Sequence, residues 1–190
     1  MTTLVLDVET VANDRLPEYV AKFEPRPPAP EPEPEEEAPK KKKKKAAKKI
    51  AEKKGKADKP GLSFLTGKIA CICVKPLGKP AQAFADEDEE AILGAFHEYL
   101  IEHRPISLVT YNGRSFDVPF LQMRGLLHGY DLSPHLPNDR FAKNHIDIYA
   151  DILGGKWSSQ NGKLAELAWY FSVDSIDGSG ADVQKQYDAG

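Results

Sequence analysis

The sequence predicts an α/β fold, a sheet flanked by helices. Three observations support this class: short β-branched or apolar runs typical of buried strands, longer segments with helical spacing between them, and the order strand, hairpin strands, helix, strand, helices. With 190 residues, of which 41% are hydrophobic, the chain can bury one core. We therefore predict a single domain over residues 1–190.

The first strand is predicted over residues 3–8, where the sequence TLVLDV is β-branched and apolar. The composition then changes abruptly, because residues 24–60 contain many prolines, a block of glutamates and a block of lysines. Proline removes backbone donors, and so little apolar surface cannot offset the entropy lost on ordering. We therefore predict that residues 24–60 are a long disordered charged insertion, which separates the first strand from its neighbours in the sheet.

The remaining elements follow after about residue 62. We expect two hairpin strands (68–74 and 81–84), a helix that begins at the acidic cluster 86–90, a buried strand (107–110), and helices over 115–128, 146–153, 164–171 and from 181 onward. The acidic residues at the start of the first helix suit the positive end of the helix dipole. The helix after the 107–110 strand is expected to follow an Asn112-Gly113 turn.

The net charge of −3 conceals an asymmetry along the chain. Residues 24–60 carry 13 Lys+Arg and 8 Asp+Glu, whereas the rest of the chain carries 13 basic and 21 acidic side chains. An acidic domain that meets an acidic polymer needs bound cations or a separate basic element. The lysines from Lys40 to Lys59 are either an arm that gathers nucleic acid or a solvated linker, and both interpretations stay open. Because no aromatic residue is interleaved there, base stacking by this segment is not expected.

Other features limit the location and the chemistry. The longest apolar stretch, residues 69–74, is far shorter than a membrane-spanning helix, and the first residues do not resemble a secretory signal. We expect no membrane partner and a cytoplasmic location. Cys71 and Cys73 are expected to be buried strand cysteines, since no further Cys or His pair completes a zinc site. The glycine-rich phosphate-binding pattern of ATP-driven enzymes is also absent.

Two acidic residues in the first strand are the first candidates for chemistry. Side chains two apart in a strand point to the same face, so Asp7 and Glu9 present two carboxylates side by side. Their repulsion is relieved by hard divalent cations such as Mg²⁺, which prefer oxygen ligands. The alternative is an acidic strand end that is exposed to solvent.

A second constellation follows the strand at 107–110. The sequence LVTYNGRSFD runs from this strand through the Asn112-Gly113 turn to Asp117, which is predicted near the start of the next helix. Such a junction is held by the scaffold and remains open to ligand. The alternative is that Asn112 serves only the turn and Asp117 only the N-terminus of the helix.

These motifs together resemble a known family, the DnaQ-like (DEDD) 3'-5' exonucleases with a ribonuclease H-like fold. Within it, the sequence is similar to the predicted exonuclease domain related to that of family B DNA polymerases. The resemblance rests on LVLDVET at residues 4–10, on LVTYNGRSFDVPFL at residues 108–121, and on a looser tail that ends in IDGSGADVQKQYDAG. It covers nearly the whole chain outside residues 24–60, and it implies a ribonuclease H-like mixed sheet flanked by helices, into which the charged segment is inserted.

The resemblance also implies a function. Asp7, Glu9 and Asp117 match three of the four acids that hold two Mg²⁺ or Mn²⁺ ions in the family, and these ions act on the phosphodiester at a 3' end. Thr10, Asn112 and Phe116 are the candidates for contacting the terminal nucleotide, although Phe116 is at least as well explained as a core residue. The expected partner is a single-stranded or frayed 3' end of DNA or RNA.

The sequence departs from the family pattern at its end. The resemblance implies a later helix with Tyr-x-x-x-Asp or His-x-x-x-x-Asp, so we expect the sequence to be truncated and to lack the fourth acid. We interpret the Tyr-x-x-x-Asp at Tyr170 to Asp174 as a coincidence, because a turn intervenes. His145 and Asp147 either approach the cleft or serve as a surface histidine and a helix cap, and the latter is favoured. The alternative function is an inactive nucleic-acid-binding or protein-interaction module.

Overall fold

The computed structural model describes residues 2–12, 60–155, 163–173 and 182–189. The chain divides into two compact units, one of residues 1–11 and 68–190, and the other of residues 12–67. The elements in chain order are β1 (Thr2–Ala12), the 3-10 turn η1 (Pro60–Leu62), β2 (Gly67–Pro76), β3 (Gln82–Ala85), α3 (Glu89–Glu102), β4 (Ile106–Thr110), α4 (Asp117–Leu127), β5 (His145–Asp147), the π-helical turn η2 (Ile148–Ile152), α5 (Leu164–Tyr170) and α6 (Val183–Asp188).

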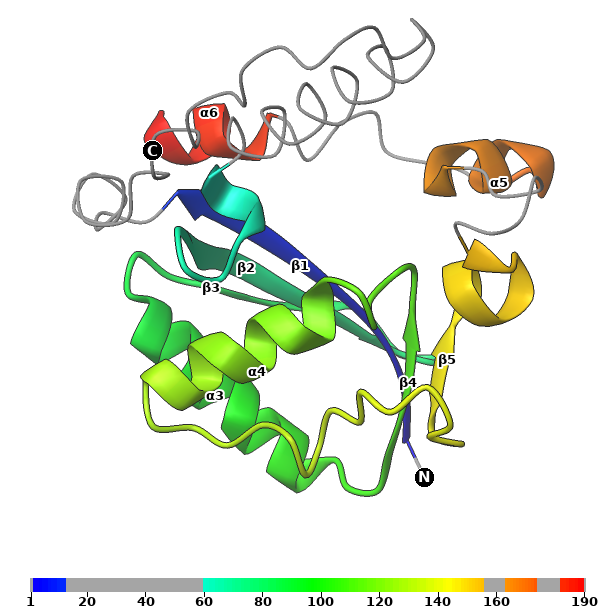
Figure 1. Ribbon diagram of the computed structural model, residues 1–190, viewed down its shortest axis with the longest axis horizontal. Coiled ribbons are helices and arrows are strands. Elements are labelled where there is room, and N and C mark those ends of the chain that lie inside the picture. Colours follow the sequence, from blue (N-terminus) through cyan, green and yellow to red (C-terminus); the bar gives the residue numbers. More distant parts are fainter. Residues whose placement is uncertain (1, 13–59, 156–162, 174–181, 190) are drawn as a thin grey trace, which may run out of the picture. The chain divides into compact units, whose positions relative to one another are not determined.

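The five strands form one mixed sheet in the order β3-β2-β1-β4-β5 (Figure 1). β1 pairs in parallel with β4, and β4 pairs in parallel with β5, whereas β2 and β3 form an antiparallel hairpin. The amide of Leu77, directly after β2, donates to the carbonyl of Thr3 at the start of β1. The strand with the D-x-E motif is therefore the central strand of the sheet. The predicted α/β fold, a mixed sheet with helices, is confirmed.

The core lies between the sheet and the helices α3 and α4 (Figure 1). β1 buries Leu4, Leu6 and Val8 on this side, because alternate residues of a strand point to opposite faces. Each helix adds a buried apolar stripe, for example Phe96 in α3 and Leu121 in α4. The opposite face of β1 carries Asp7, Glu9 and the exposed Val5.

α3 begins as the sequence predicts. Asp88 is its N-cap, and the Asp88 side chain accepts a hydrogen bond from the amide of Glu90 at 3.0 Å. Glu89 is buried, however, and its carboxylate joins α3 to α4 and β2 by accepting hydrogen bonds from the Arg124 side chain and from the amide of Ile69. The acidic cluster therefore supplies an internal ion pair in addition to favourable charges at the helix start.

The predicted helix over residues 146–153 is wrong in its first part. Residues 145–147 form β5, in which Ile146 lies opposite Val109 of β4, and only then does the π-helical turn η2 begin. Pairing with an available strand edge overrides the local helical spacing. α5 and α6 lie within or close to the predicted helices.

The predicted insertion falls largely outside the described residues. Its last residue, Pro60, begins η1, and after this turn the amides of Thr66 and Gly67 donate to the carbonyl of Ser63. The interpretations of the lysine block likewise concern residues outside the described ranges. None of the helices in the described part of the chain has the length and apolarity that crossing a membrane requires.

Candidate active site

The central strand presents the first two candidate acids. Because Leu4, Leu6 and Val8 are buried in the core, Asp7 and Glu9 lie on the opposite face of β1, where Asp7 is exposed and Glu9 is half-buried. Burial and then the negative charge of Asp7 raise the pKa of Glu9. The two carboxylates therefore interact, as the D-x-E spacing predicts.

The third candidate acid approaches the same strand from α4. Asp117 is the first residue of this helix and is 6% exposed. Burial and then the charge of Asp7 raise the pKa of Asp117 to about 7, while hydrogen bonds from the amides of Asp117 and Val8 act in the opposite direction. The fold thus brings Asp117 close to Asp7, although the two lie far apart in the sequence.

Asp7 interacts electrostatically with each of the other two acids. The donors are the hard oxygen ligands that Mg²⁺ and Mn²⁺ prefer, and a cation between them would relieve the repulsion that raises two of the pKa values. Across the described ranges, three or more His, Cys, Asp or Glu side chains do not gather in an arrangement that could hold a metal ion. The residue types suit a divalent cation, whereas the described side chains form a set of interacting carboxylates and not an assembled metal site.

The turn before Asp117 has a defined backbone. Asn112 has φ of 62°, in the left-handed region that Asn tolerates better than most residues. A Cβ atom on Gly113 would lie 2.5 Å from the side chain of Thr110, so only glycine is accommodated there. The Asn-Gly pair is therefore required by the path of the chain between β4 and α4.

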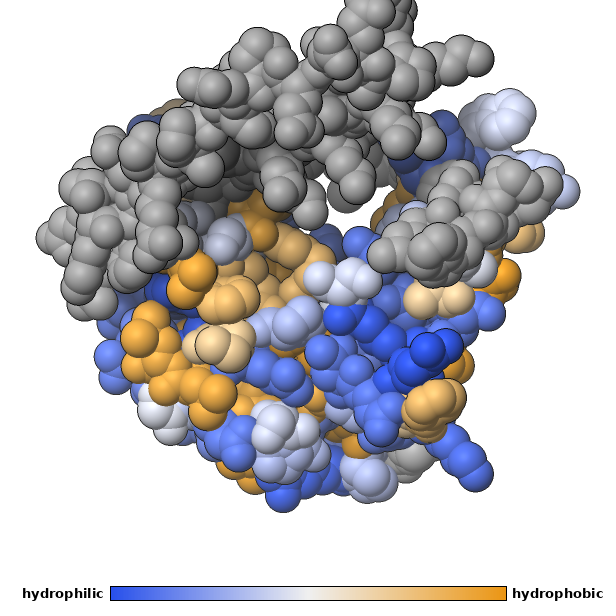
Figure 2. Space-filling view, viewed as in Figure 1, coloured by the Kyte–Doolittle hydropathy of each residue, from blue (hydrophilic) through white to orange (hydrophobic). Residues whose placement is uncertain are grey.

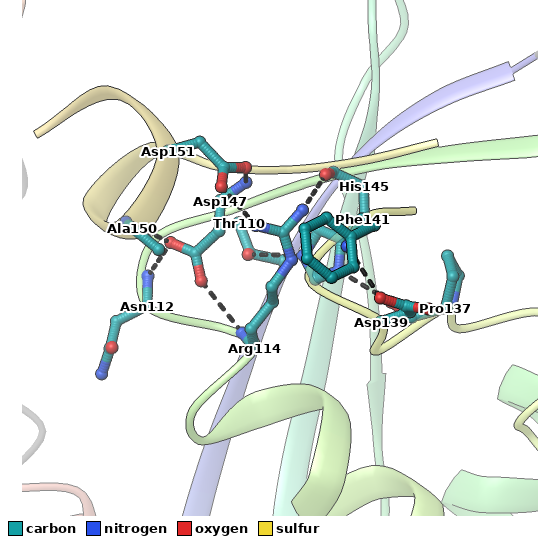
Figure 3. A network of polar contacts seen from close by, with 10 residues as sticks. All are labelled: Thr110, Asn112, Arg114, Pro137, Asp139, Phe141, His145, Asp147, Ala150 and Asp151. Atoms are coloured by element: carbon teal, nitrogen blue, oxygen red, sulfur yellow. Dashed lines mark hydrogen bonds and ion pairs between the residues drawn. The ribbon is translucent and has the colours of Figure 1, made fainter. Parts of the chain in front are cut away.

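Asp147 holds this turn in place (Figure 3). Its side chain is fully buried and accepts hydrogen bonds from the amides of Asn112 at 2.8 Å and of Arg114 at 3.0 Å. It also accepts from the amide of Ala150 at the start of η2, so the predicted capping role is confirmed. The side-chain amide of Asn112 points away from Asp147 in Figure 3. Asp147 therefore joins the end of β5 to the turn that leads to Asp117.

The interpretation of His145 as a surface residue is wrong. His145 is 2% exposed, with Nδ1 2.8 Å from the carbonyl of Pro137 and Nε2 2.9 Å from the hydroxyl of Thr110. Because a carbonyl only accepts, Nδ1 donates to Pro137 and Nε2 accepts from Thr110. Burial lowers the pKa of His145 below its ordinary value. The positive charge of Arg114 lowers this pKa further. His145 is thus a hydrogen-bonded neutral residue of the interior.

The residues predicted to contact nucleic acid have different environments. Thr10 follows Glu9 in β1 and is half-buried. Phe116 is the N-cap residue of α4 and packs against the core, with its ring centroid 5.5 Å from that of Phe120, which agrees with its core interpretation. Tyr170 is the last residue of α5 and is 74% exposed, whereas Asp174 lies outside the described residues.

The predicted burial of both cysteines is wrong. Cys71 is half-buried and Cys73 is exposed, and their sulfur atoms lie 3.6 Å apart. Burial, Cys73 and the charges of Glu9 and Asp7 raise the pKa of the Cys71 thiol to about 12. The strand β2 therefore brings its cysteines to the face of the sheet that carries the D-x-E motif.

A groove with a volume of about 1150 Å³ lies at the ends of β4 and β5. It shares the turn before Asp117, through Asn112 and Ser115, but Asp7, Glu9 and Asp117 do not line it. The sequence alone does not predict this groove. Its basic and aromatic residues come from separate segments, and no short motif signals that they meet.

Comparison with known proteins adds the family. Residues 68–190 match the family described as "Predicted 3'-5' exonuclease related to the exonuclease domain of PolB". The chain belongs to this family. The resemblance inferred from the D-x-E and N-x-x-x-F-D motifs is thereby confirmed.

Relatives of this PolB-related exonuclease domain include DNA polymerases. The chain is 36% identical over 70 residues to the catalytic subunit of DNA polymerase epsilon from Emericella nidulans and 41% identical over 49 residues to that from Saccharomyces cerevisiae. These matches cover 37% and 26% of the chain, and 3% and 2% of those proteins. One part of the family B DNA polymerase of Pyrobaculum calidifontis has a similar fold. This likeness has a TM-score of 0.57 and 16% sequence identity, and it covers 99% of this chain and 21% of the polymerase. The fold is therefore ribonuclease H-like.

Proposed function

We propose that this chain hydrolyses phosphodiester bonds at the 3' ends of DNA or RNA with the aid of Mg²⁺ or Mn²⁺. The observation that carries the proposal is the approach of the buried Asp117 carboxyl group to Asp7, beside Glu9, in a PolB-related exonuclease domain. Asp7, Glu9 and Asp117 would hold the cations. When bound, such ions lower the pKa of an attacking water and stabilise the departing oxygen.

The side chains contribute in separate ways. Asp7 and Glu9 project from the central strand of the sheet, and Asp117 projects from a helix that packs on the core, so all three are attached to regular elements. Asp147 fixes the turn that precedes Asp117, because its carboxylate accepts hydrogen bonds from two backbone amides of that turn. Rigid support of this kind keeps reacting groups within the small tolerances that catalysis needs.

Release of nucleotides by the full chain tests the proposal. Single-stranded oligonucleotides, blocked at the 3' end or at the 5' end, are incubated with and without Mg²⁺. We expect release only with Mg²⁺ and only from a free 3' end, and its abolition in Asp7→Asn and Asp117→Asn. Glu98→Gln, an exposed residue of α3, is the matched control and should retain the parental rate.

The second candidate is a module that binds nucleic acid without hydrolysing it. It predicts binding that is equal in the parent and in Asp7→Asn, with no release of nucleotides at any Mg²⁺ concentration. Release from a free 3' end that is lost in Asp7→Asn would exclude this candidate.

A further inference from the structure

Two cysteines lie side by side on β2. Cys71 and Cys73 are two residues apart in the strand, so both point to the same face of the sheet, and their sulfur atoms lie 3.6 Å apart. Figure 2 shows the side of the molecule where apolar residues gather over α4, one of the helices that cover the core. Ile72 and Val74 are buried in that core, so the cysteines belong to the other face of the sheet. They are the only cysteines of the chain.

The neighbouring strand leaves the cysteine pair accessible. In the β2-β3 hairpin, Cys71 lies opposite Ala85 and Cys73 lies opposite Ala83, and residues directly opposite each other share a face of the sheet. Both alanines are exposed, and their side chains are too small to cover the sulfur atoms. Cys73 is exposed as well, and Cys71 is half-buried. A small ligand can therefore reach the pair from solvent.

The surroundings of the pair favour a positive ion. Burial and Cys73, and then the charges of the two D-x-E acids, raise the pKa of the Cys71 thiol, so these acids act on the sulfur through space. Lys75 is the next residue of β2 on this face, but its ammonium group donates to the carbonyl of Lys79 at 2.6 Å in the turn that follows. A cation at the sulfur atoms would therefore interact favourably with the carboxylates of β1.

The distance between the sulfur atoms indicates which partner suits the pair. A disulfide needs about 2.05 Å between its sulfur atoms, which is much shorter than the 3.6 Å found here. Two sulfur atoms bonded at about 2.3 Å on opposite sides of a linear two-coordinate ion would be about 4.6 Å apart, which is much longer. Around a tetrahedral ion with the same bond length they would be about 3.8 Å apart, within about 0.2 Å of the distance in the structure. The spacing therefore suits Zn²⁺, which is tetrahedral and accepts thiolate ligands.

We propose that Cys71 and Cys73 together bind one Zn²⁺ ion through their sulfur atoms. Both thiols release their protons to solvent, and two metal-sulfur bonds replace bonds between the ion and water, without any transfer of electrons. In the described ranges no group of three or more His, Cys, Asp or Glu side chains could hold a metal ion, so water completes the tetrahedron. The site is separate from the carboxylates proposed to hold Mg²⁺, and it does not rest on the proposed function.

Titration of the reduced full chain with Cd²⁺ tests the site, because Cd²⁺ also binds thiolates and the bond between them absorbs ultraviolet light. Excess Mg²⁺ is present to occupy oxygen ligands. We expect saturation at one Cd²⁺ per chain with a dissociation constant on the order of 10 μM, since two thiolates bind less tightly than the four ligands of a structural zinc site. Cys71→Ser and Cys73→Ser should each weaken binding at least about tenfold. Glu98→Gln, at an exposed position of α3, is the matched control and should bind like the parent.

Alkylation by N-ethylmaleimide, counted by mass spectrometry, is a second measurement that is made on the parent chain. Because the chain contains two cysteines, the label reports this pair alone. Zn²⁺ should slow the labelling of both thiols in the parent. The single thiol that is left in Cys71→Ser or in Cys73→Ser should be labelled at nearly the same rate with and without Zn²⁺.

Four results would overturn the site. They are the absence of the ultraviolet band even in large excess of Cd²⁺, a band of equal affinity in Cys73→Ser, saturation at one ion per two chains, and labelling of the parent at a rate that Zn²⁺ does not change. Saturation at one ion per two chains would place the cation between molecules. None of these measurements contains nucleic acid, so a failure of the cysteine site is distinguishable from a failure of the proposed hydrolysis.

Discussion

The carboxyl group of Asp117 is buried at the start of α4 close to Asp7 of β1, and burial together with the charge of Asp7 raises its pKa to about 7. The first residue of α4 therefore lies close to the central strand β1, although a long stretch of sequence separates the two elements. Burial and a neighbouring negative charge both disfavour an ionised carboxylate. Unless a cation is bound beside it, ionised Asp117 therefore lowers the free energy of unfolding.

The pH dependence of stability reports this cost. Asp117 binds its proton more tightly in the folded chain than in the unfolded chain. The stability that this protonation adds to the folded state is fully present below about pH 4 and is lost as the pH rises through about 7. In EDTA, the stability of Asp117→Asn relative to the parent should therefore increase from pH 4 to pH 8, by an amount on the order of 4 kcal/mol at most. Urea unfolding at several pH values measures this difference. A difference that does not vary with pH would contradict the assigned burial and charge.

Divalent cations should stabilise the fold through the same residues. Because a ligand that binds only the folded state stabilises it by mass action, MgCl₂ is expected to raise the midpoint of thermal unfolding by several degrees. Asp7→Asn and Asp117→Asn should abolish the rise, and Glu98→Gln should retain it. KCl at equal ionic strength is the control for general salt effects. A rise of equal size in all variants would place the cation elsewhere.

Asp147 should be essential for the turn before α4. Its carboxylate accepts hydrogen bonds from the backbone amides of Asn112, Arg114 and Ala150. An asparagine side chain has one acceptor oxygen, and its NH₂ group would face amide hydrogens that it cannot accept. We expect Asp147→Asn to lower the free energy of unfolding by about 2 to 4 kcal/mol. Asp131→Asn is the control, since Asp131 accepts hydrogen bonds from Ser133 at an exposed position and its replacement should change the free energy of unfolding much less. Similar losses in both variants would show that the buried turn contacts are not important.

Glu89 and Glu90 are adjacent residues of the same type in the first turn of α3, and the different burial of their side chains makes them a matched pair. Glu89 accepts hydrogen bonds from Arg124 and from the amide of Ile69 in the interior, whereas the Glu90 side chain is 62% exposed. Glu89→Gln leaves the buried Arg124 without its counter-charge and should cost about 3 to 5 kcal/mol. Glu90→Gln should cost less than about 0.5 kcal/mol. Calorimetry of both variants checks this, and equal melting temperatures would show that the pair does not join α3 to α4.

The fold follows from the sequence wherever local pattern and burial agree. The alternation of Leu4, Leu6 and Val8 with Asp7 and Glu9 predicts both the central strand and the face that carries the acids. The acidic start of α3 predicts its first turn but not the burial of Glu89, because that depends on Arg124 in a helix that follows later in the chain.

The sequence-based predictions are wrong where partners are distant in sequence. The spacing of residues 146–153 is helical, but the exposed edge of β4 provides hydrogen-bond partners for residues 145–147, and a strand forms instead. His145 is polar, which favours a surface position, yet Thr110 and Pro137 satisfy both of its ring nitrogens in the interior. Neither partner can be identified from local spacing.

By itself the sequence determined the α/β class, the D-x-E strand and the family, because strand alternation and short motifs are properties of neighbouring residues. Only the tertiary structure decided that Asp117 is buried close to Asp7, that Asp147 holds the turn between β4 and α4, and that Phe141 and Tyr149 line one groove. The physical reason is that electrostatic repulsion, desolvation and side-chain hydrogen bonds act through space, and their distances are set by how β1, β4, β5 and α4 pack together.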